Sequence, residues 1–201
     1  MNIEDLIPTL KIHSVSRISL DLELRKQFKK LKKGAVLDTG AKYSPYKKYI
    51  PFTEYLTLDI EKDYQPDICS DLHDIKWQSE YFDTVLAIEV LHYLYNPQKA
   101  INEMFRVLKP GGKLIMSVRF ILPYDVREKD YYRFTPDSLS YLLRKFKQVE
   151  ICHHGNKLQV IWRLLEDRKL KVLLNVFNPF FARIRVKKTR TPLGFVVLAE
   201  K

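Results

Sequence analysis

The sequence predicts an α/β fold, namely a doubly wound, mostly parallel sheet with helices on both faces. Two observations carry this prediction. Short apolar segments of strand length alternate with segments of helical periodicity from residue 35 to the end of the chain, which is the pattern of repeated β-α units. Polar residues follow directly after several of the apolar segments, as in Asp38-Thr39-Gly40 and at Asp59. In a doubly wound sheet such strand ends gather at one edge, where ligands bind.

The composition is that of one globular domain. The 201 residues, 46% hydrophobic and 29% charged, suffice for a single sizeable core. The two cysteines, Cys69 and Cys152, lack the spacing of a metal site or a disulfide scaffold. The first residues do not resemble a signal peptide, and no run of about 18 apolar residues predicts a membrane-spanning helix. We therefore expect one domain over 1–201, without a metal site, in the cytoplasm.

Seven strands are expected from short apolar runs. The segment 81–88 is mostly apolar, which indicates a strand buried on both faces. The strands are expected at 35–39, 54–58, 66–70, 81–88, 113–118, 149–153 and 195–199.

Helices are expected where apolar residues recur at helical spacing between these strands. The N-terminal part, 1–33, is expected to be helical and to cover the sheet. Its leucines and Phe28 recur at helical spacing and predict the first helix, and Gly34 is a signal for its C-terminal end. Thr135 and the proline after it supply the cap and first turn of another helix. The helices are expected at 19–33, 44–50, 97–108, from 135 onward and at 157–184.

The loop after the first strand has the layout of a nucleotide-type site. Gly40 allows the backbone to turn tightly, and Asp59, at the tip of the second strand, can accept hydrogen bonds from both hydroxyls of a ribose. Gly40 is the only glycine in this loop, because Lys42 and Pro45 stand at the other two glycine positions of the dinucleotide-binding pattern. The loop alone therefore indicates a nucleotide cofactor without specifying which one.

Four segments in order specify the cofactor further. They cover 36–41, 57–59, 69–73 followed by 82–86, and 89–114, and the last includes the turn Lys109-Pro-Gly-Gly112. Together they resemble the motifs of class I S-adenosylmethionine-dependent methyltransferases (type 11-like). The resemblance implies S-adenosylmethionine as cofactor and a Rossmann-like methyltransferase fold of seven strands, the last antiparallel. The segment Asp130-Tyr-Tyr-Arg-Phe-Thr135 is similar to one found in small bacterial and archaeal members linked to cell-surface glycan assembly.

The resemblance also implies cofactor contacts. The loop around Gly40 would approach the methionyl part, Asp59 would hold the ribose, and Asp71 with the Leu72 backbone would face the adenine amino group. Ile88 and Glu89 would lie near the sulfonium end. The complete cofactor set is Asp38, Gly40, Ala41, Lys42, Asp59, Ile60, Asp71, Leu72, Ile88 and Glu89.

Lys42 departs from the family pattern, which has a second glycine there. Its ammonium could pair with the cofactor carboxylate, or it could point to solvent. A third alternative is a degenerate loop that binds the cofactor weakly or not at all.

Catalytic candidates lie in the loops that overhang the expected site. His92 follows the fourth strand and is the obvious titrating group. Tyr131 and Arg133 could line an acceptor pocket, with Arg133 available for a phosphate or carboxylate. Each has a structural alternative, because His92 could be a packed helix residue and the other two an aromatic corner. Further candidates are Tyr93, Arg119, Tyr124, Asp125, Asp130 and Tyr132.

The positive charge is concentrated near the C-terminus. The segment 157–190 contains ten Lys or Arg against Glu166 and Asp167, a net charge of +8 out of +11 for the whole chain. Apolar and aromatic residues alternate with these cations. The segment is therefore expected to be a basic amphipathic helical insertion that packs on the sheet or on a second copy, contacts an anionic membrane, or binds RNA.

The resemblance implies a methyltransferase, which we expect to act on a small-molecule or glycan-type acceptor by direct methyl displacement. Its expected location is the cytoplasm, with peripheral membrane contact through 157–190 left open, and it would be a monomer or a homodimer. An RNA methyltransferase, favoured by the charge, and a catalytically silent scaffold, favoured by Lys42, are the alternatives.

Overall fold

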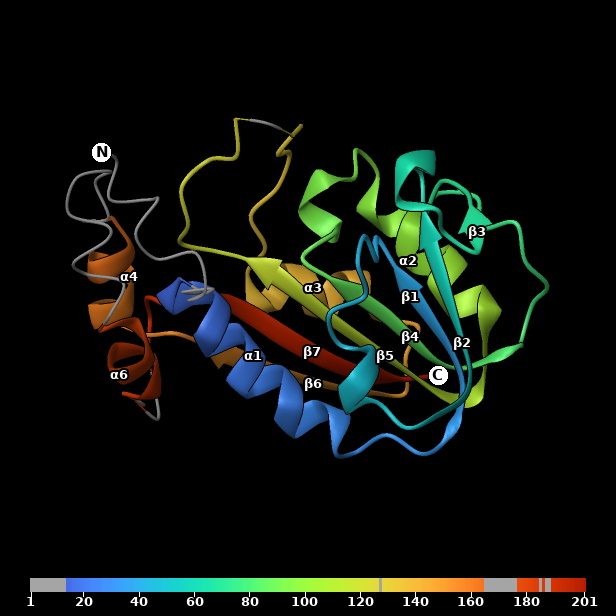
Figure 1. The fold of residues 1–201 in the computed structure, drawn as a ribbon, viewed down its shortest axis with the longest axis horizontal. Helices are drawn as coiled ribbons and strands as arrows, with labels where there is room; N and C mark the ends of the chain where they lie inside the picture. Colours follow the sequence, from blue (N-terminus) through green and yellow to red (C-terminus); the bar gives the residue numbers. More distant parts are fainter. Residues whose placement is uncertain (1–13, 127, 165–176, 185, 187–188) are drawn as a thin grey trace, which may run out of the picture.

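A seven-stranded sheet forms the centre of the computed structural model, which describes residues 14–126, 128–164, 177–184, 186 and 189–201. Its strand order is β3-β2-β1-β4-β5-β7-β6, with β7 antiparallel to both of its neighbours and the other pairings parallel. The predicted doubly wound, mostly parallel sheet with an antiparallel last strand is confirmed (Figure 1). The strands are β1 Gly34–Thr39, β2 Phe52–Asp59, β3 Ile68–Cys69, β4 Phe82–Ile88, β5 Leu108–Arg119, β6 Gln148–His154 and β7 Gly194–Glu200.

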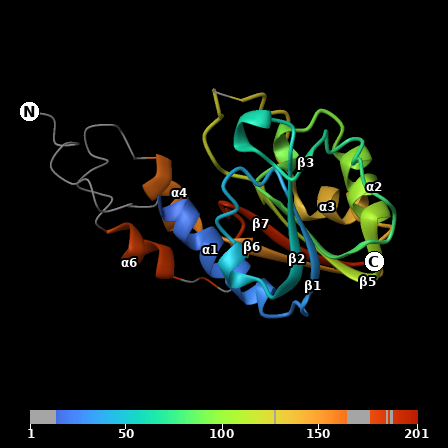
Figure 2. The ribbon, with the colours of Figure 1, turned by 45° about the vertical axis from the view of Figure 1, so that its right-hand side comes forward.

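Helices cover both faces of the sheet, which lies between α1 and the pair α2 and α3 in Figure 2. Side chains alternate along each strand, so neighbouring residues face opposite layers. Val36 packs in one buried cluster with Leu24 of α1, whereas Leu37 packs in another with Met104 of α2. Within the described residues, the α-helices are α1 Val15–Phe28, α2 Pro97–Val107, α3 Pro136–Leu142, α4 Lys157–Leu164 and α6 Asn178–Arg183.

Several element bounds differ from the expected ones. Helix α1 begins four residues before the expected start at 19, because the Ser14 side chain accepts a hydrogen bond from the Arg17 backbone N–H and caps the helix there. The segment 44–50 contains only a short 3-10 turn, Lys47–Tyr49. The expected strand at 66–70 is reduced to the two residues of β3.

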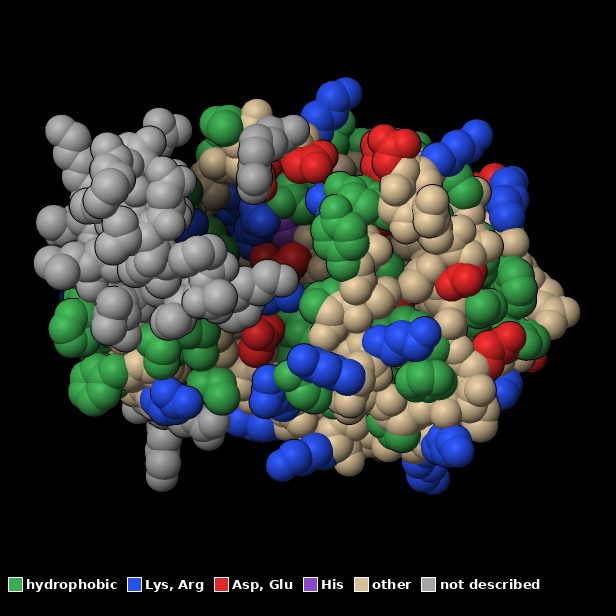
Figure 3. Space-filling model, in the orientation of Figure 1, with side chains coloured by type: hydrophobic (Ala, Val, Ile, Leu, Met, Phe, Trp, Pro, Cys, Tyr) green, Lys and Arg blue, Asp and Glu red, His purple; other side chains and the backbone are tan. Residues whose placement is uncertain are grey.

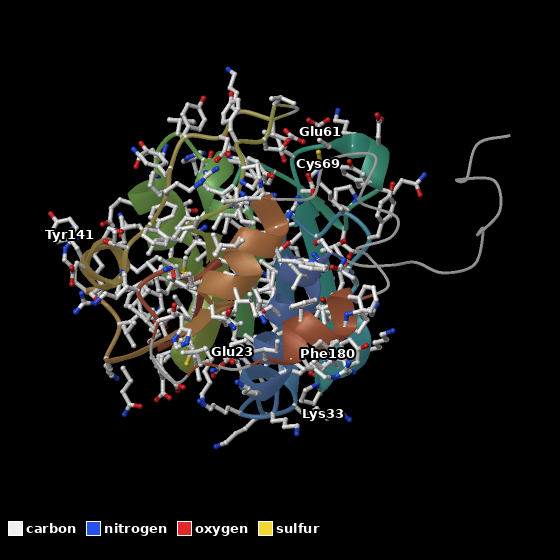
Figure 4. All side chains as sticks on the ribbon, turned by 90° about the vertical axis from the view of Figure 1, so that its left-hand side faces the viewer. Glu23, Lys33, Glu61, Cys69, Tyr141 and Phe180 are labelled. Atoms are coloured by element: carbon white, nitrogen blue, oxygen red, sulfur yellow. The ribbon has the colours of Figure 1, made fainter. Side chains whose placement is uncertain are left out.

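In the described part of the basic segment, the helices α4 and α6 pack against α1. The indole of Trp162 in α4 stacks on Phe181 in α6 with ring centroids 4.0 Å apart, and its Nε1 donates to Asn178 Oδ1 at 2.8 Å. Asn156, just before α4, donates to the backbone carbonyl of Ile184 at 2.7 Å. Figure 4 views this end of the molecule, with α4 and α6 in front of α1. The expected single helix over 157–184 includes 165–176, which lie outside the described residues.

None of the described helices is long and apolar enough to cross a bilayer.

Candidate functional site

A cavity of about 540 Å³ opens at the carboxyl ends of β1, β2 and β4. The strand order reverses at this point, because β1 lies between β2 and β4. Crevices at such a switch point are where open α/β sheets bind ligands, and the volume suits a molecule the size of a nucleoside derivative. We call this the cofactor cavity.

Gly40 forms the turn at the floor of the cofactor cavity. Its φ is +61°, and a Cβ added to it would lie 2.4 Å from Cγ2 of Val90. Only glycine fits both the backbone angle and this close approach. The Gly40 N–H donates to the carbonyl of Leu58 at 2.8 Å, which holds the turn against the end of β2.

Asp59 presents its carboxylate to the cavity from the tip of β2. Its side chain accepts the backbone N–H of Lys42 at 3.3 Å and that of Glu61 at 3.1 Å. These two bonds fix the carboxylate and leave further lone pairs available for the hydroxyls of a ligand. Apolar walls of the cavity come from Leu58, Ile60, Leu72, Val90 and Leu94. A carboxylate beside an apolar slot fits a ribose joined to a flat base.

His73, which the sequence patterns do not single out, also lines the cofactor cavity. Its Nδ1 lies 2.6 Å from Asp71 Oδ1, and its Nε2 accepts the backbone N–H of Asn96 at 3.3 Å. Because Nε2 is an acceptor, Nδ1 carries the proton and donates to Asp71. The imidazole also stacks on Tyr95, with ring centroids 4.1 Å apart. The signal was present in the spacing of Asp71 and His73, two residues apart after a strand.

Glu89 follows β4 with a left-handed backbone, φ +58°, which is rare for a residue with a side chain. Its backbone N–H donates to the carbonyl and to Oγ of Ser117. Its carboxylate accepts from Ser117 Oγ at 3.1 Å and from Arg119 Nε at 3.0 Å. Strained backbone of this kind persists where the surroundings fix it, and it is frequent at functional sites.

A second cavity, of about 430 Å³, lies beyond Glu89, which lines both. We call it the acceptor cavity. It is bounded by the start of α1, the segment 119–126 after β5, the end of β6 and Arg163 of α4. Figure 3 shows a recess on this face in which basic, acidic and histidine side chains lie together.

The structure brings most of the predicted cofactor residues to one cavity. The predicted cofactor residues that line the cofactor cavity are Gly40, Lys42, Asp59, Ile60, Asp71, Leu72 and Glu89. Lys42 has φ +45°, and its Nζ lies 3.8 Å from Glu128 Oε1, beside the Tyr64 ring. Its pairing with the cofactor carboxylate stays a prediction.

Three predicted cofactor residues, Asp38, Ala41 and Ile88, are not among the described residues that line this cavity. Asp38 is 3% exposed, and its Oδ2 accepts from the Tyr55 hydroxyl at 2.7 Å. Ala41 is buried, and Ile88 packs against the cluster that contains α1.

The three predicted catalytic residues line neither cavity among the described residues. His92 is fully buried, and burial, with the nearby Arg119 guanidinium, lowers its pKa to about 3. The backbone carbonyl of His92 accepts a hydrogen bond from the Tyr131 N–H. Both terminal nitrogens of the Arg133 guanidinium donate hydrogen bonds to the Asp130 carboxylate. This arrangement favours the structural alternative, and contact of His92, Tyr131 or Arg133 with the acceptor stays a prediction.

Comparison with known proteins finds similarity to methyltransferases in part of the chain. The model of the methyltransferase domain family matches residues 39–116. An uncharacterized protein of Methanocaldococcus jannaschii, MJ0638, is 33% identical over 102 residues, which is 47% of this chain and 45% of that protein. The sterol 4-C-methyltransferase strm-1 of Caenorhabditis elegans is 30% identical over 96 residues, 47% of this chain and 28% of that protein. The chain thus spans less than half the length of these relatives.

A solved structure shares the fold over nearly the whole chain. It is a SAM-dependent methyltransferase of Thermotoga maritima, described as a possible histamine N-methyltransferase. The TM-score is 0.62 at 16% identity, covering 93% of this chain and 91% of that one.

The buried Asp38 gives a prediction for stability. Burial raises the pKa of its carboxyl from 3.8 to about 6, against the opposing effect of the Tyr55 hydrogen bond. The folded state therefore binds the proton more tightly than the unfolded state, so stability falls as pH rises from about 4 to above 6. We expect Asp38→Asn, which cannot ionise, to gain about 2 kcal/mol over the wild type between pH 4 and pH 7.

Urea unfolding of both proteins at each pH measures this difference. Asp137→Asn, an exposed substitution in the first turn of α3, is the control and should show little change with pH. An advantage of Asp38→Asn that stays constant from pH 4 to pH 7 would contradict the raised pKa.

Proposed function

We propose that the chain carries a methyltransferase domain of the class I S-adenosylmethionine-dependent superfamily and that it methylates a small-molecule or glycan-type acceptor. The observation that carries the proposal is the pair of cavities that share Glu89. One has the features of a cofactor site. The other, of about 430 Å³, has the size of a site for a small acceptor.

The residues of the cofactor cavity suit S-adenosylmethionine. When bound, this cofactor supplies an electrophilic methyl group on a sulfonium sulfur, and the protein supplies alignment. Asp59 would hold the ribose hydroxyls, Leu72 and its apolar neighbours would enclose the adenine, and the Gly40 turn would receive the methionyl part.

Glu89 is the residue that we propose to position the acceptor. Its carboxylate is held by Ser117 and Arg119, so it has little freedom to move. An acceptor hydroxyl or amine in the acceptor cavity can donate a hydrogen bond to this carboxylate, which would aim the nucleophilic atom toward the cofactor cavity. A carboxylate in this place can also take up the proton that the acceptor loses.

The two alternative functions have less support. The charge that favours an RNA acceptor lies mostly in 157–190, whereas the acceptor cavity is small and partly enclosed by α1. The silent scaffold was suggested by Lys42, yet the turn at Gly40 and the carboxylate of Asp59 keep the form of a binding site.

Calorimetric titration with S-adenosylmethionine and S-adenosylhomocysteine tests the cofactor assignment. We expect the wild type to bind both and Asp59→Ala to bind each at least tenfold more weakly, because hydrogen bonds to a charged group are lost. Asp137→Ala, a matched change on the exposed surface of α3, should bind like the wild type. Absence of binding by the wild type would refute the enzyme proposal, and unchanged affinity of Asp59→Ala would refute the placement of the ribose.

We also propose that α4 and α6 contact an anionic membrane surface. Their outer face exposes apolar side chains, of which Phe180 is 67% and Leu164 is 59% exposed. The segment 157–190 carries a net charge of +8. Apolar groups flanked by cations suit the interface of a bilayer that contains acidic lipids. Such a location would bring the acceptor cavity near lipid-linked glycans.

Vesicle flotation tests the membrane proposal. We expect the wild type to float with vesicles that contain phosphatidylserine and not with pure phosphatidylcholine. The double variant Ile161→Ser, Phe180→Ser should lose most of this binding because two exposed apolar anchors are removed. Tyr141→Ser removes an equally exposed aromatic residue, 67% exposed, from α3 and should float like the wild type. Flotation of the double variant at the wild-type level would discard the proposal.

A further inference from the structure

The acceptor cavity has different charges at its two ends. Glu89 and Asp125 lie at the end formed by β4 and β5. Arg119 forms an ion pair with each of them: its Nε lies 3.0 Å from the Glu89 carboxylate, and its Nη1 lies 3.4 Å from the Asp125 carboxylate. Arg17 of α1 and Arg163 of α4 line the cavity from the two helices that cover it. The end away from the cofactor cavity is therefore basic.

His154 lies at this basic end, and its buried imidazole makes no hydrogen bond to the described residues. It lines the acceptor cavity, it is 4% exposed, and neither ring nitrogen has a hydrogen-bond partner within the described part of the chain. A buried polar atom without a partner is costly, so such groups normally receive a ligand or water. Burial lowers the pKa of His154 to about 3, so the imidazole is neutral and has one N–H to donate.

The absence of a side chain at Gly194 in β7 leaves space for the His154 imidazole. His154 pairs with Gly194 across β6 and β7, and Gly194 pairs with Arg119 across β7 and β5. A Cβ on Gly194 would lie 2.6 Å from His154 Nε2 and 2.3 Å from the carbonyl oxygen of Val118. Glycine at position 194 is therefore required for the His154 imidazole to lie across β7 at this point.

The start of α1 adds further donors. Ser14 caps this helix of 14 residues, the first turn contains no acidic residue, and Ser14, Ser16 and Arg17 line the cavity. Backbone N–H groups at a helix N-terminus favour an anion, and guanidinium groups bind oxyanions at close range. Arg17 Nε also lies 3.3 Å from Asp21, which fixes the side chain along the helix.

The strand order sets the distance between the two ends. Glu89 follows β4 and His154 ends β6, and β5 and β7 lie between them. Three strand spacings amount to about 14 Å. An acceptor that reaches from one end to the other is therefore an elongated small molecule.

On these grounds we infer that the methyl acceptor carries a phosphate group, which is bound by Arg17, Arg163, His154 and the start of α1, at the opposite end of the cavity from Glu89. This inference rests on the proposed function, because it names the substrate class of the same acceptor cavity. Phosphate is favoured over carboxylate because donors from three elements converge, and a tetrahedral dianion presents more acceptor oxygens than a planar carboxylate.

Titration with inorganic phosphate tests the inference on the full chain. NMR of the protein labelled with nitrogen-15 in its histidines follows the ring nitrogens of His154, and we expect them to shift as phosphate binds. Arg17→Gln and Arg163→Gln should each weaken phosphate binding about tenfold, since a contact to a charged group is lost. Arg183→Gln, an exposed arginine of α6 that does not line the cavity, should stay within about twofold of the wild type.

Three outcomes would overturn the inference: ring resonances of His154 that do not respond to phosphate, equal affinities in the cavity variants and the Arg183 control, or acetate bound as tightly as phosphate. Titration of the same proteins with S-adenosylhomocysteine separates this result from the proposed function. If S-adenosylhomocysteine binds and phosphate does not, the phosphate inference alone fails. If phosphate binds at His154 and S-adenosylhomocysteine does not, the methyltransferase proposal fails.

Discussion

The left-handed turn at Glu89 is the constraint on which both cavities depend. A side chain in this conformation costs about 1 kcal/mol, and the backbone bonds to Ser117 with the Arg119 contact offset it. From this turn the Glu89 side chain lines both the cofactor cavity and the acceptor cavity. Arg119 then extends the network, because it contacts Asp125 and lies over the Tyr93 ring at 5.3 Å.

This network also links the described parts of the overhanging loops to one another. The Tyr93 hydroxyl donates to Asp125 at 3.0 Å, and the Asp125 N–H donates to Asp130. The Asp130 carboxylate in turn accepts a hydrogen bond from the Arg133 guanidinium. The charged groups that look available for chemistry in the sequence are therefore largely occupied in supporting one another. Glu89 differs from them because it combines fixed geometry with exposure to both cavities.

The sequence could predict the elements that depend on local pattern. Strand ends at Gly40, Asp59, Asp71 and Glu89 follow from short apolar runs and from the rule that parallel strands place their carboxyl ends together. It could not predict groups assembled by tertiary contacts. His154 and Arg17 are more than a hundred residues apart and meet because β6 lies next to β7 under the start of α1. The burial of His92 and Asp38 could not be predicted from the sequence for the same reason. Residues distant in the sequence determine whether a polar side chain is exposed to water.

A crystal structure of the protein with S-adenosylhomocysteine tests the assignment of the two cavities most directly. We expect the ligand in the cofactor cavity, with its ribose hydroxyls on Asp59 and its sulfur on the side of Glu89, and with the acceptor cavity still open beyond it. A ligand that occupies the cavity of Arg17 and His154 instead, or whose ribose lies away from Asp59, would contradict the assignment of the two cavities.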